Sequence, residues 1–279
     1  MTVDDTMMDL KTATPLVLVG AGKMGGAMLE GWLGRGLEAS GVFVLDPNPP
    51  AEMVEFIAAR GLRHKTTPPA SLTASVIVLA VKPQILDAVL PTLAHLVGAD
   101  TIVLSIAAGK TIESILDGIG RAAIVRAMPN TPAQIGRGIT VAVPNELVTD
   151  QQRTLVSALL AAVGDVEWVD REDLIDAVTA VSGSGPAYVF HLVEALAAAG
   201  VTAGLDAALA ARLARATIEG AGELLYQSPL DPAILRQNVT SPKGTTAAAL
   251  DVLMAPDGLT KLMTSAVAAA ANRSRELAG

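Results

Sequence analysis

The chain has 279 residues, of which 51% are hydrophobic and 3% aromatic, so it accommodates two modest domains with cores built mainly from aliphatic side chains. Its formal net charge of -8 at pH 7 excludes a general affinity for nucleic acid or for anionic membranes, because both require clustered Lys and Arg. The absence of cysteine excludes disulfides, a thiolate nucleophile and a Cys-ligated metal site.

Residues 1–13 are expected to form a flexible leader. The start of the chain carries Asp4, Asp5 and Asp9, where a signal peptide would need basic residues and an apolar run. No uncharged apolar run reaches the roughly 18 residues that a membrane span requires. We therefore expect a cytoplasmic protein with no membrane partner, which agrees with the lack of cysteine.

Residues 14–168 are expected to form a dinucleotide-binding domain with a Rossmann-like, doubly wound α/β sheet. Short β-branched runs alternate with helix-like segments, and continuously apolar strands are typical of parallel sheets buried on both faces. The helices between them complete βαβ units. The expected strands are 16–19, 42–45, 76–81, 102–106, 123–126 and 139–143, and the expected helices include 24–37, 51–60 and 84–96.

The first expected strand runs directly into the sequence Gly20-Ala21-Gly22-Lys23-Met24-Gly25. This GxGxxG pattern predicts a dinucleotide-binding loop. The first glycine allows a tight turn, the second lets a pyrophosphate approach the backbone, and the third lets the helix pack on the strand. The pyrophosphate then faces the N-terminus of the helix. A glycine turn that only packs tightly is the alternative.

Asp46 ends the second expected strand. An acidic side chain at this place accepts hydrogen bonds from the adenine ribose of NAD and repels the 2′-phosphate of NADP. An Asp-Pro turn with Pro47, which merely closes the strand, is the alternative. The sequence therefore leaves the choice between NADPH and NADH open.

Further candidates follow the other strands, because ligands of open α/β sheets collect at the carboxyl ends of strands. Lys82 is a candidate to bind a carboxylate or phosphate, with a plain surface lysine as the alternative. Asn130 is a candidate to present a polar group to the nicotinamide or the substrate, with a rigid loop as the alternative. The scattered histidines have no metal-ligand neighbours in sequence, so no metal site is expected. The cofactor candidates at these strand ends are Ala80, Val81, Lys82, Pro83, Ala107 and Asn130.

Residues 169–279 are expected to form an all-α domain, because after Trp168 the alternation stops and helix follows helix. Segments 189–196 and 207–218 carry apolar residues on more of their circumference than one core-facing stripe needs. We infer a partner surface and hence a homodimer.

Two segments of the helical half are not explained by packing alone. Residues 173–188 break a helix with small residues and restart it at Pro186. Residues 238–246 form a helix-to-helix turn whose exposed backbone N–H groups are candidates to hold a carboxylate.

Together with the glycine loop and the runs 81–83 and 128–132, these segments closely resemble the pyrroline-5-carboxylate reductase family, from residue 16 to residue 277. The resemblance implies a Rossmann domain followed by a helical dimerisation domain, with substrate between the two and dimers that often assemble further. It implies reduction of 1-pyrroline-5-carboxylate to L-proline by NADPH or NADH, as the last step of proline biosynthesis. The family's substrate-binding turn, with its threonine last, falls on Ser241, Gly244, Thr245 and Thr246.

Our hypothesis is that Thr246 hydrogen-bonds the ring nitrogen of an iminium substrate, while the backbone of residues 244–246, helped by Lys82 or Lys243, binds the carboxylate. The family usually has a small residue where this chain has Lys243. A β-hydroxyacid dehydrogenase is the competing enzyme, but its catalytic lysine is missing after Gly185. A non-catalytic dinucleotide-binding redox sensor is the other alternative.

Overall fold

The computed structural model describes residues 10–278, and the chain divides into two compact units. The first unit reaches Gly183 and includes the chain from Ala271 onward, and the second is Ser184–Ala270. The division falls later than the boundary expected after Trp168. Residues beyond Trp168 still pack on the sheet, and Ile175 belongs to one of its cores. We therefore place the end of the first unit after Gly183.

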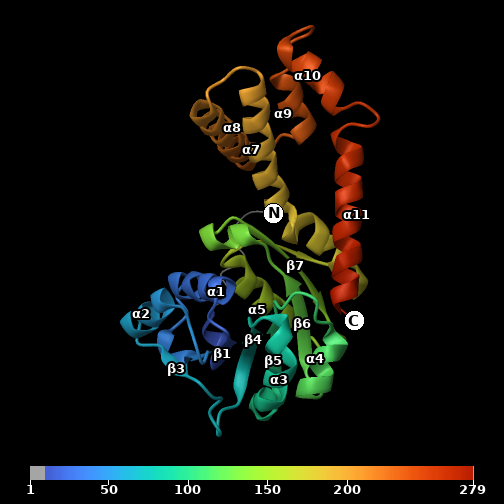
Figure 1. Ribbon diagram of the computed structural model, residues 1–279. Coiled ribbons are helices and arrows are strands. Elements are labelled where there is room, and N and C mark those ends of the chain that lie inside the picture. The colour runs from blue at the N-terminus through green and yellow to red at the C-terminus, as the bar shows by residue number, and fades with distance from the viewer. Residues whose placement is uncertain (1–9, 279) are drawn as a thin grey trace. The chain divides into compact units, whose positions relative to one another are not determined.

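An eight-stranded sheet forms the centre of the first unit, in the order β3-β2-β1-β4-β5-β6-β7-β8 (Figure 1). Neighbouring strands are parallel, except that β6 and β7 are antiparallel. The strands are β1 (Leu16–Val19), β2 (Val42–Leu45), β3 (Arg63–Lys65), β4 (Ala74–Leu79), β5 (Val97–Ser105), β6 (Ala123–Met128), β7 (Gly138–Pro144) and β8 (Gly164–Trp168).

Helices cover both faces of this sheet. Successive residues of β1 alternate between two cores: Leu16 and Leu18 face the core beneath α1, α2 and α5, and Val17 and Val19 face the core beneath α3 and α4. This alternation confirms the predicted doubly wound fold. The α-helices of the unit are α1 (Lys23–Gly34), α2 (Ala51–Ala59), α3 (Pro83–Leu93), α4 (Ile112–Ile119), α5 (Asp150–Ala161) and α6 (Ile175–Val178). The short 3-10 and π turns are η1 (Leu10–Ala13), η2 (Ala39–Gly41), η3 (Ala94–Leu96), η4 (Thr131–Ile135), η5 (Glu172–Leu174) and η6 (Thr179–Gly183).

Two strands and one strand direction differ from the prediction. The sequence predicted neither β3, whose three residues are all exposed, nor β8, whose Asp165 and Glu167 are exposed. Such edge strands lack the apolar run by which buried strands are recognised. The direction of β7 was also unexpected. Only η4 lies between β6 and β7, and parallel strands require a much longer crossover.

The last four residues of the predicted leader have a regular structure. Leu10–Ala13 form the 3-10 helix η1, and Leu10 and Ala13 are buried in the core beneath α1 and α5. Residues 1–9, the rest of the predicted leader, lie outside the described residues.

The second unit is entirely helical, as predicted for this half of the chain. Its helices α7 and α8 pack closely through small residues: a Cβ atom on Gly200 would lie 3.2 Å from the Cβ atom of Ala210. The helices are α7 (Gly185–Thr202), α8 (Ala207–Gln227), α9 (Pro232–Asn238) and α10 (Thr245–Leu253), and α11 (Leu259–Ala278) begins in this unit. No residue of α7 is fully buried, and Phe190 is 65% exposed.

Candidate functional site

The glycine loop (residues 20–25) joins the buried strand β1 to α1. Gly20 has a positive φ of 93°, and a Cβ atom there would lie 2.8 Å from the carbonyl oxygen of Ala80. A Cβ atom on Gly25 would lie 2.2 Å from the carbonyl oxygen of Gly20. Both glycines are therefore required by the fold, the first for the turn and the third for the approach of helix to strand.

Gly22 differs from these two glycines. A Cβ atom on Gly22 would meet nothing within 4 Å, and its φ of -71° is one that any residue adopts. Packing within the chain therefore does not explain this glycine. The open space above it is what a dinucleotide pyrophosphate needs to approach the backbone.

The helix N-termini of the predicted site lack side-chain caps. The helices α4, α5, α8 and α9 are each capped by a Thr or Asp side chain that accepts from a backbone N–H. By contrast, α1 begins after Gly22, α3 after Lys82 and α10 after Gly244, and none of these has a side-chain cap bond. The helices α2, α6 and α7 lack one as well. Uncapped helix starts leave N–H groups and a partial positive charge for an anion.

The carboxylate of Asp46 lies against the glycine loop. Its Oδ2 accepts a hydrogen bond from the backbone N of Ala21 at 2.8 Å, and its Oδ1 accepts one from the backbone N of Asn48 at 2.9 Å. The second bond closes an Asp-Pro turn, while the first holds the acid at the loop. The Asp-Pro turn expected as the alternative is therefore present, and the contact of Asp46 with an adenine ribose stays a prediction.

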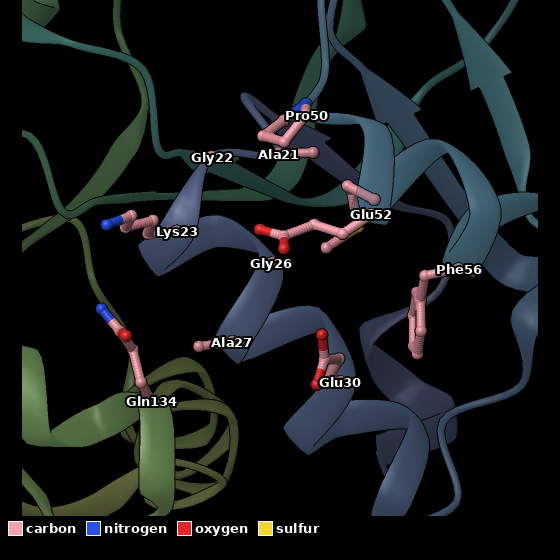
Figure 2. Close-up of a pocket in the computed structure, with 11 residues that line it drawn as sticks. Ala21, Gly22, Lys23, Gly26, Ala27, Glu30, Pro50, Glu52, Phe56 and Gln134 are labelled. Atoms are coloured by element: carbon pink, nitrogen blue, oxygen red, sulfur yellow. The ribbon is translucent and has the colours of Figure 1, made fainter.

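A pocket of about 340 Å³ opens between α1 and α2, beside the glycine loop. Its size lies in the range of small-molecule sites. Figure 2 shows the carboxylates of Glu52 and Glu30 reaching into it, with Lys23 near the start of α1 and Gln134 opposite. Gly22 lines the same pocket, so the loop and the pocket form one continuous surface.

The structure brings Ala80 and Val81 to the glycine loop. The backbone N of Ala80 donates to the carbonyl of Val19 at 2.8 Å, just past the end of β4. Lys82 follows as the exposed N-cap of α3, and Pro83 is the first residue of that helix. This strand end therefore borders the glycine loop, and its contact with the cofactor stays a prediction.

The other two strand-end candidates are held by the fold. Ala107 is buried, and its backbone N lies 3.4 Å from the Ser105 hydroxyl oxygen to which it donates. The Oδ1 atom of Asn130 accepts from the backbone N of Ile139 at 3.0 Å. This bond supports the rigid-loop interpretation of Asn130.

A buried ion pair at the eight-stranded sheet, between Arg126 and Glu172, was not predicted from the sequence. Arg126 is 4% exposed, and its guanidinium donates to Oε1 of Glu172 at 2.7 Å. The same oxygen accepts from the backbone N of Ile112, the first residue of α4, at 2.8 Å. A lone arginine within an apolar strand was the available signal, since a buried cation requires a partner. No group of three metal-ligating side chains occurs among the described residues.

The predicted substrate turn lies in the second unit. The backbone N of Gly244 donates to the carbonyl of Ser241 at 3.0 Å and closes a turn with Pro242 in its second position. Lys243, in the third position, has a positive φ of 58°. This position favours glycine, so Lys243 holds a backbone conformation that is unusual for its residue type. Thr246 follows half-buried in the first turn of α10.

These features define a class of protein. A parallel sheet with a glycine loop after its first strand, an acid after its second and an open pyrophosphate position is typical of a nicotinamide dinucleotide-dependent oxidoreductase. Within residues 10–278, no helix is both long and apolar enough to cross a membrane.

Comparisons with known proteins identify the family. The description "NADP oxidoreductase coenzyme F420-dependent" matches residues 15–109, and "Pyrroline-5-carboxylate reductase dimerisation" matches residues 172–277. The pyrroline-5-carboxylate reductase of Pseudomonas aeruginosa is 40% identical over 95% of this chain and 98% of its own length. That of Synechocystis is 47% identical over 75% of this chain and 77% of its own length. The chain belongs to the pyrroline-5-carboxylate reductase family.

Solved structures agree with this assignment. A pyrroline-5-carboxylate reductase from Coxiella burnetii matches 96% of this chain and 99% of its own, with a TM-score of 0.88 and 34% identity. A pyrroline carboxylate reductase from Plasmodium falciparum, solved with NADP bound, matches 95% of this chain and 98% of its own, with a TM-score of 0.77 and 28% identity. The predicted family and the predicted use of a nicotinamide cofactor are thus confirmed.

Proposed function

We propose that this protein reduces 1-pyrroline-5-carboxylate to L-proline with NADPH or NADH, the last step of proline biosynthesis. The observation that carries the proposal is the near full-length identity of 40% to the Pseudomonas aeruginosa reductase. The open glycine at position 22 supports the cofactor half of the reaction, because it leaves the backbone accessible to a pyrophosphate.

In this proposal, the first unit holds the cofactor. The N–H groups at the start of α1 bind the pyrophosphate, with Gly22 against it. Asp46 faces the adenine ribose, and Ala80 and Val81 border the dinucleotide where β4 ends. Lys82 is placed to balance the phosphate charge. The bound cofactor supplies the hydride, so the chain itself needs no nucleophile.

The second unit supplies the substrate turn. The uncapped N–H groups of α10, starting at Thr245, bind the substrate carboxylate, and Ser241 and Gly244 fix the turn that presents them. The hydroxyl of Thr246 accepts a hydrogen bond from the protonated ring nitrogen and orients the C=N carbon toward the hydride. A threonine hydroxyl is a poor acid, so the substrate enters as the iminium and Thr246 positions it.

We further propose a cytoplasmic homodimer that assembles into a higher oligomer. The support for the dimer is the match of residues 172–277 to a dimerisation family and the large exposed apolar side chains of α7, α8 and α11. Exposed apolar side chains gathered on neighbouring helices are typical of protein–protein interfaces. The support for the cytoplasm is the lack of cysteine.

A spectrophotometric assay tests the proposed reaction. The protein is incubated with 1-pyrroline-5-carboxylate and either NADH or NADPH, and nicotinamide absorbance and L-proline are both followed. Loss of absorbance with stoichiometric proline supports the proposal. Dinucleotide binding without oxidation would instead identify a redox sensor, and turnover only with a 3-hydroxy acid and oxidised cofactor would identify a dehydrogenase.

A further inference from the structure

The position of the Asp46 carboxylate bears on which dinucleotide the protein uses. Each of its oxygens accepts one backbone N–H, from Ala21 at 2.8 Å and from Asn48 at 2.9 Å. A carboxylate oxygen has a second lone pair, so each can still accept a hydroxyl proton. The two backbone bonds also prevent the acid from turning away from the glycine loop. Asp46 is therefore a fixed negative acceptor at the carboxyl end of β2.

A second acid lines the pocket that includes Ala21, the residue whose amide donates to Asp46. Glu52 lies in the first turn of α2, and Figure 2 shows its carboxylate directed across the pocket toward α1. Glu30 lines the pocket farther along α1, and Lys23 is the cation among its lining residues. The pocket beside the glycine loop is thus lined by more acidic than basic side chains.

The neighbouring basic side chains are held by contacts of their own, two on aromatic rings and one on the backbone of Asp46. The guanidinium of Arg63 lies 4.9 Å from the centre of the Phe43 ring. That of Arg60 lies 5.3 Å from the centre of the Phe56 ring, which lines the pocket, so Arg60 is a second cation beside the pocket, in addition to Lys23 at the start of α1. The His64 ring is hydrogen-bonded through Nε2 to the carbonyl of Asp46 at 2.7 Å.

One more cation, Lys65, lies in β3, and the register of that strand shows which face of the sheet it occupies. Lys65 pairs with Leu45, so it shares the sheet face of Leu45 rather than that of Val44. Val44 belongs to the core beneath α1 and α2, whereas Leu45 belongs to the opposite core. Lys65 therefore lies on the face away from the groove between these two helices.

We infer that the adenosine end of this site selects NADH over NADPH, and that Asp46 and Glu52 are the residues that determine this specificity. The inference rests on the proposed function, since it assumes a dinucleotide on the glycine loop. A free ribose diol donates hydrogen bonds to the fixed carboxylate of Asp46. A 2′-phosphate has no proton to donate there and places like charge beside two acids.

Binding measured without substrate tests this specificity independently of turnover. Isothermal titration calorimetry compares NADH with NADPH, and the fragment 5′-AMP with adenosine 2′,5′-bisphosphate. We expect the forms without the 2′-phosphate to bind at least about tenfold more tightly, because like charges at close range cost several kcal/mol. Equal binding, or tighter binding of the 2′-phosphorylated forms, would overturn the inference.

Three variants assign the effect to residues. Asp46→Asn keeps an oxygen for the Ala21 amide but removes the charge, and Glu52→Gln removes the other charge. In both variants, the ratio of NADH affinity to NADPH affinity should be smaller than in the unmodified protein. Glu55→Gln is the matched control, because Glu55 is exposed on the same helix but does not line the pocket. A change in Glu55→Gln as large as that in Glu52→Gln would reject the local assignment.

Two further outcomes distinguish this inference from a 2′-phosphate site at Lys65 and from the proposed reaction. If Lys65→Ala weakens NADPH binding and leaves NADH binding unchanged, then Lys65 binds the 2′-phosphate and the assignment of an acidic adenosine end is wrong. If proline is not formed with either cofactor although the fragments show the expected preference, then the proposed reaction fails while the cofactor specificity stands.

Discussion

Arg126 and Glu172 form an ion pair of 2.7 Å that joins β6, the last of the consecutive parallel strands, to the short η5 turn after β8. The arginine is almost fully buried, and the glutamate side chain is 29% exposed. Because Glu172 also accepts from the first amide of α4, one carboxylate connects three segments that are distant in sequence. The pair therefore fixes the carboxyl edge of the sheet, where ligands of this fold class bind.

Removing one partner of this pair is expected to destabilise the protein. Glu172→Gln leaves the Arg126 guanidinium buried without a countercharge, so the free energy of unfolding should fall by about 3 kcal/mol. Urea denaturation measures the change. Glu146→Gln, a charge change at an exposed loop position, is the control and should have little effect. In the double variant Arg126→Met/Glu172→Leu, much of the loss should be recovered; if it is not, the pair has a role beyond charge compensation.

The sequence was informative where function depends on local pattern. The glycine loop could be predicted because its three glycines are adjacent in sequence and follow a buried strand. Gly20 and Gly25 then proved to be required by close contacts, and Gly22 by none within the chain. The location of Asp46 beside the glycine loop could likewise be predicted, because the residue directly follows the second strand.

Features that depend on distant partners were not predictable in the same way. Arg126 and Glu172 are 46 residues apart, and the pattern of an apolar strand does not reveal which acid will meet its arginine. The edge strands β3 and β8 are stabilised by pairing rather than by an apolar run of their own. The role of Thr246 came from family resemblance, since a threonine in the first turn of a helix is not distinctive by itself.

Thr246 provides a direct test of the proposed substrate contact. Thr246→Ala should lower kcat/KM for 1-pyrroline-5-carboxylate about 10- to 100-fold, the loss of one hydrogen bond worth about 1–3 kcal/mol to the transition state. Thr246→Ser should retain most activity. Thr264→Ala, which removes an exposed hydroxyl bonded only within α11, serves as the control. Full turnover and unchanged KM in Thr246→Ala would exclude the contact.

Lys243 occupies a backbone conformation that suits glycine. Lys243→Gly should relieve this left-handed strain and raise the free energy of unfolding by about 0.5–1 kcal/mol, after allowing for the greater flexibility of glycine in the unfolded chain. Thermal unfolding measures the stability, and steady-state kinetics shows whether the lysine also contacts the substrate. An increase in KM without a change in kcat would show that the ammonium also holds the substrate carboxylate.

The exposed apolar helices of the second unit are expected to form the dimer interface. Phe190 is 65% exposed on α7, so Phe190→Glu should place a charge in that interface and shift the protein toward monomers. Analytical ultracentrifugation measures the assembly. The control is Val54→Glu, which adds the same charge at a 48% exposed apolar residue of α2 in the first unit. Dissociation by neither variant would place the interface elsewhere, and dissociation by both would contradict an interface confined to the second unit.

Replacing Gly25 by alanine is expected to lower stability, whereas replacing Gly22 by alanine is expected to weaken cofactor binding. Gly25→Ala forces a Cβ atom to within 2.2 Å of the Gly20 carbonyl oxygen, so it should lower the free energy of unfolding by about 1–3 kcal/mol. Gly22→Ala meets no atom within 4 Å and should alter stability by less than about 0.5 kcal/mol.

The loss in Gly22→Ala should appear in cofactor binding instead. The added methyl group occupies the space proposed for the pyrophosphate, so the affinity for NADH measured by calorimetry should fall at least about tenfold, which is about 1.4 kcal/mol. Gly34→Ala is the matched control, since it adds a methyl group in open space at the far end of the same helix. If Gly22→Ala bound NADH as tightly as Gly34→Ala does, the pyrophosphate would not lie against Gly22, and the proposed cofactor position would be wrong.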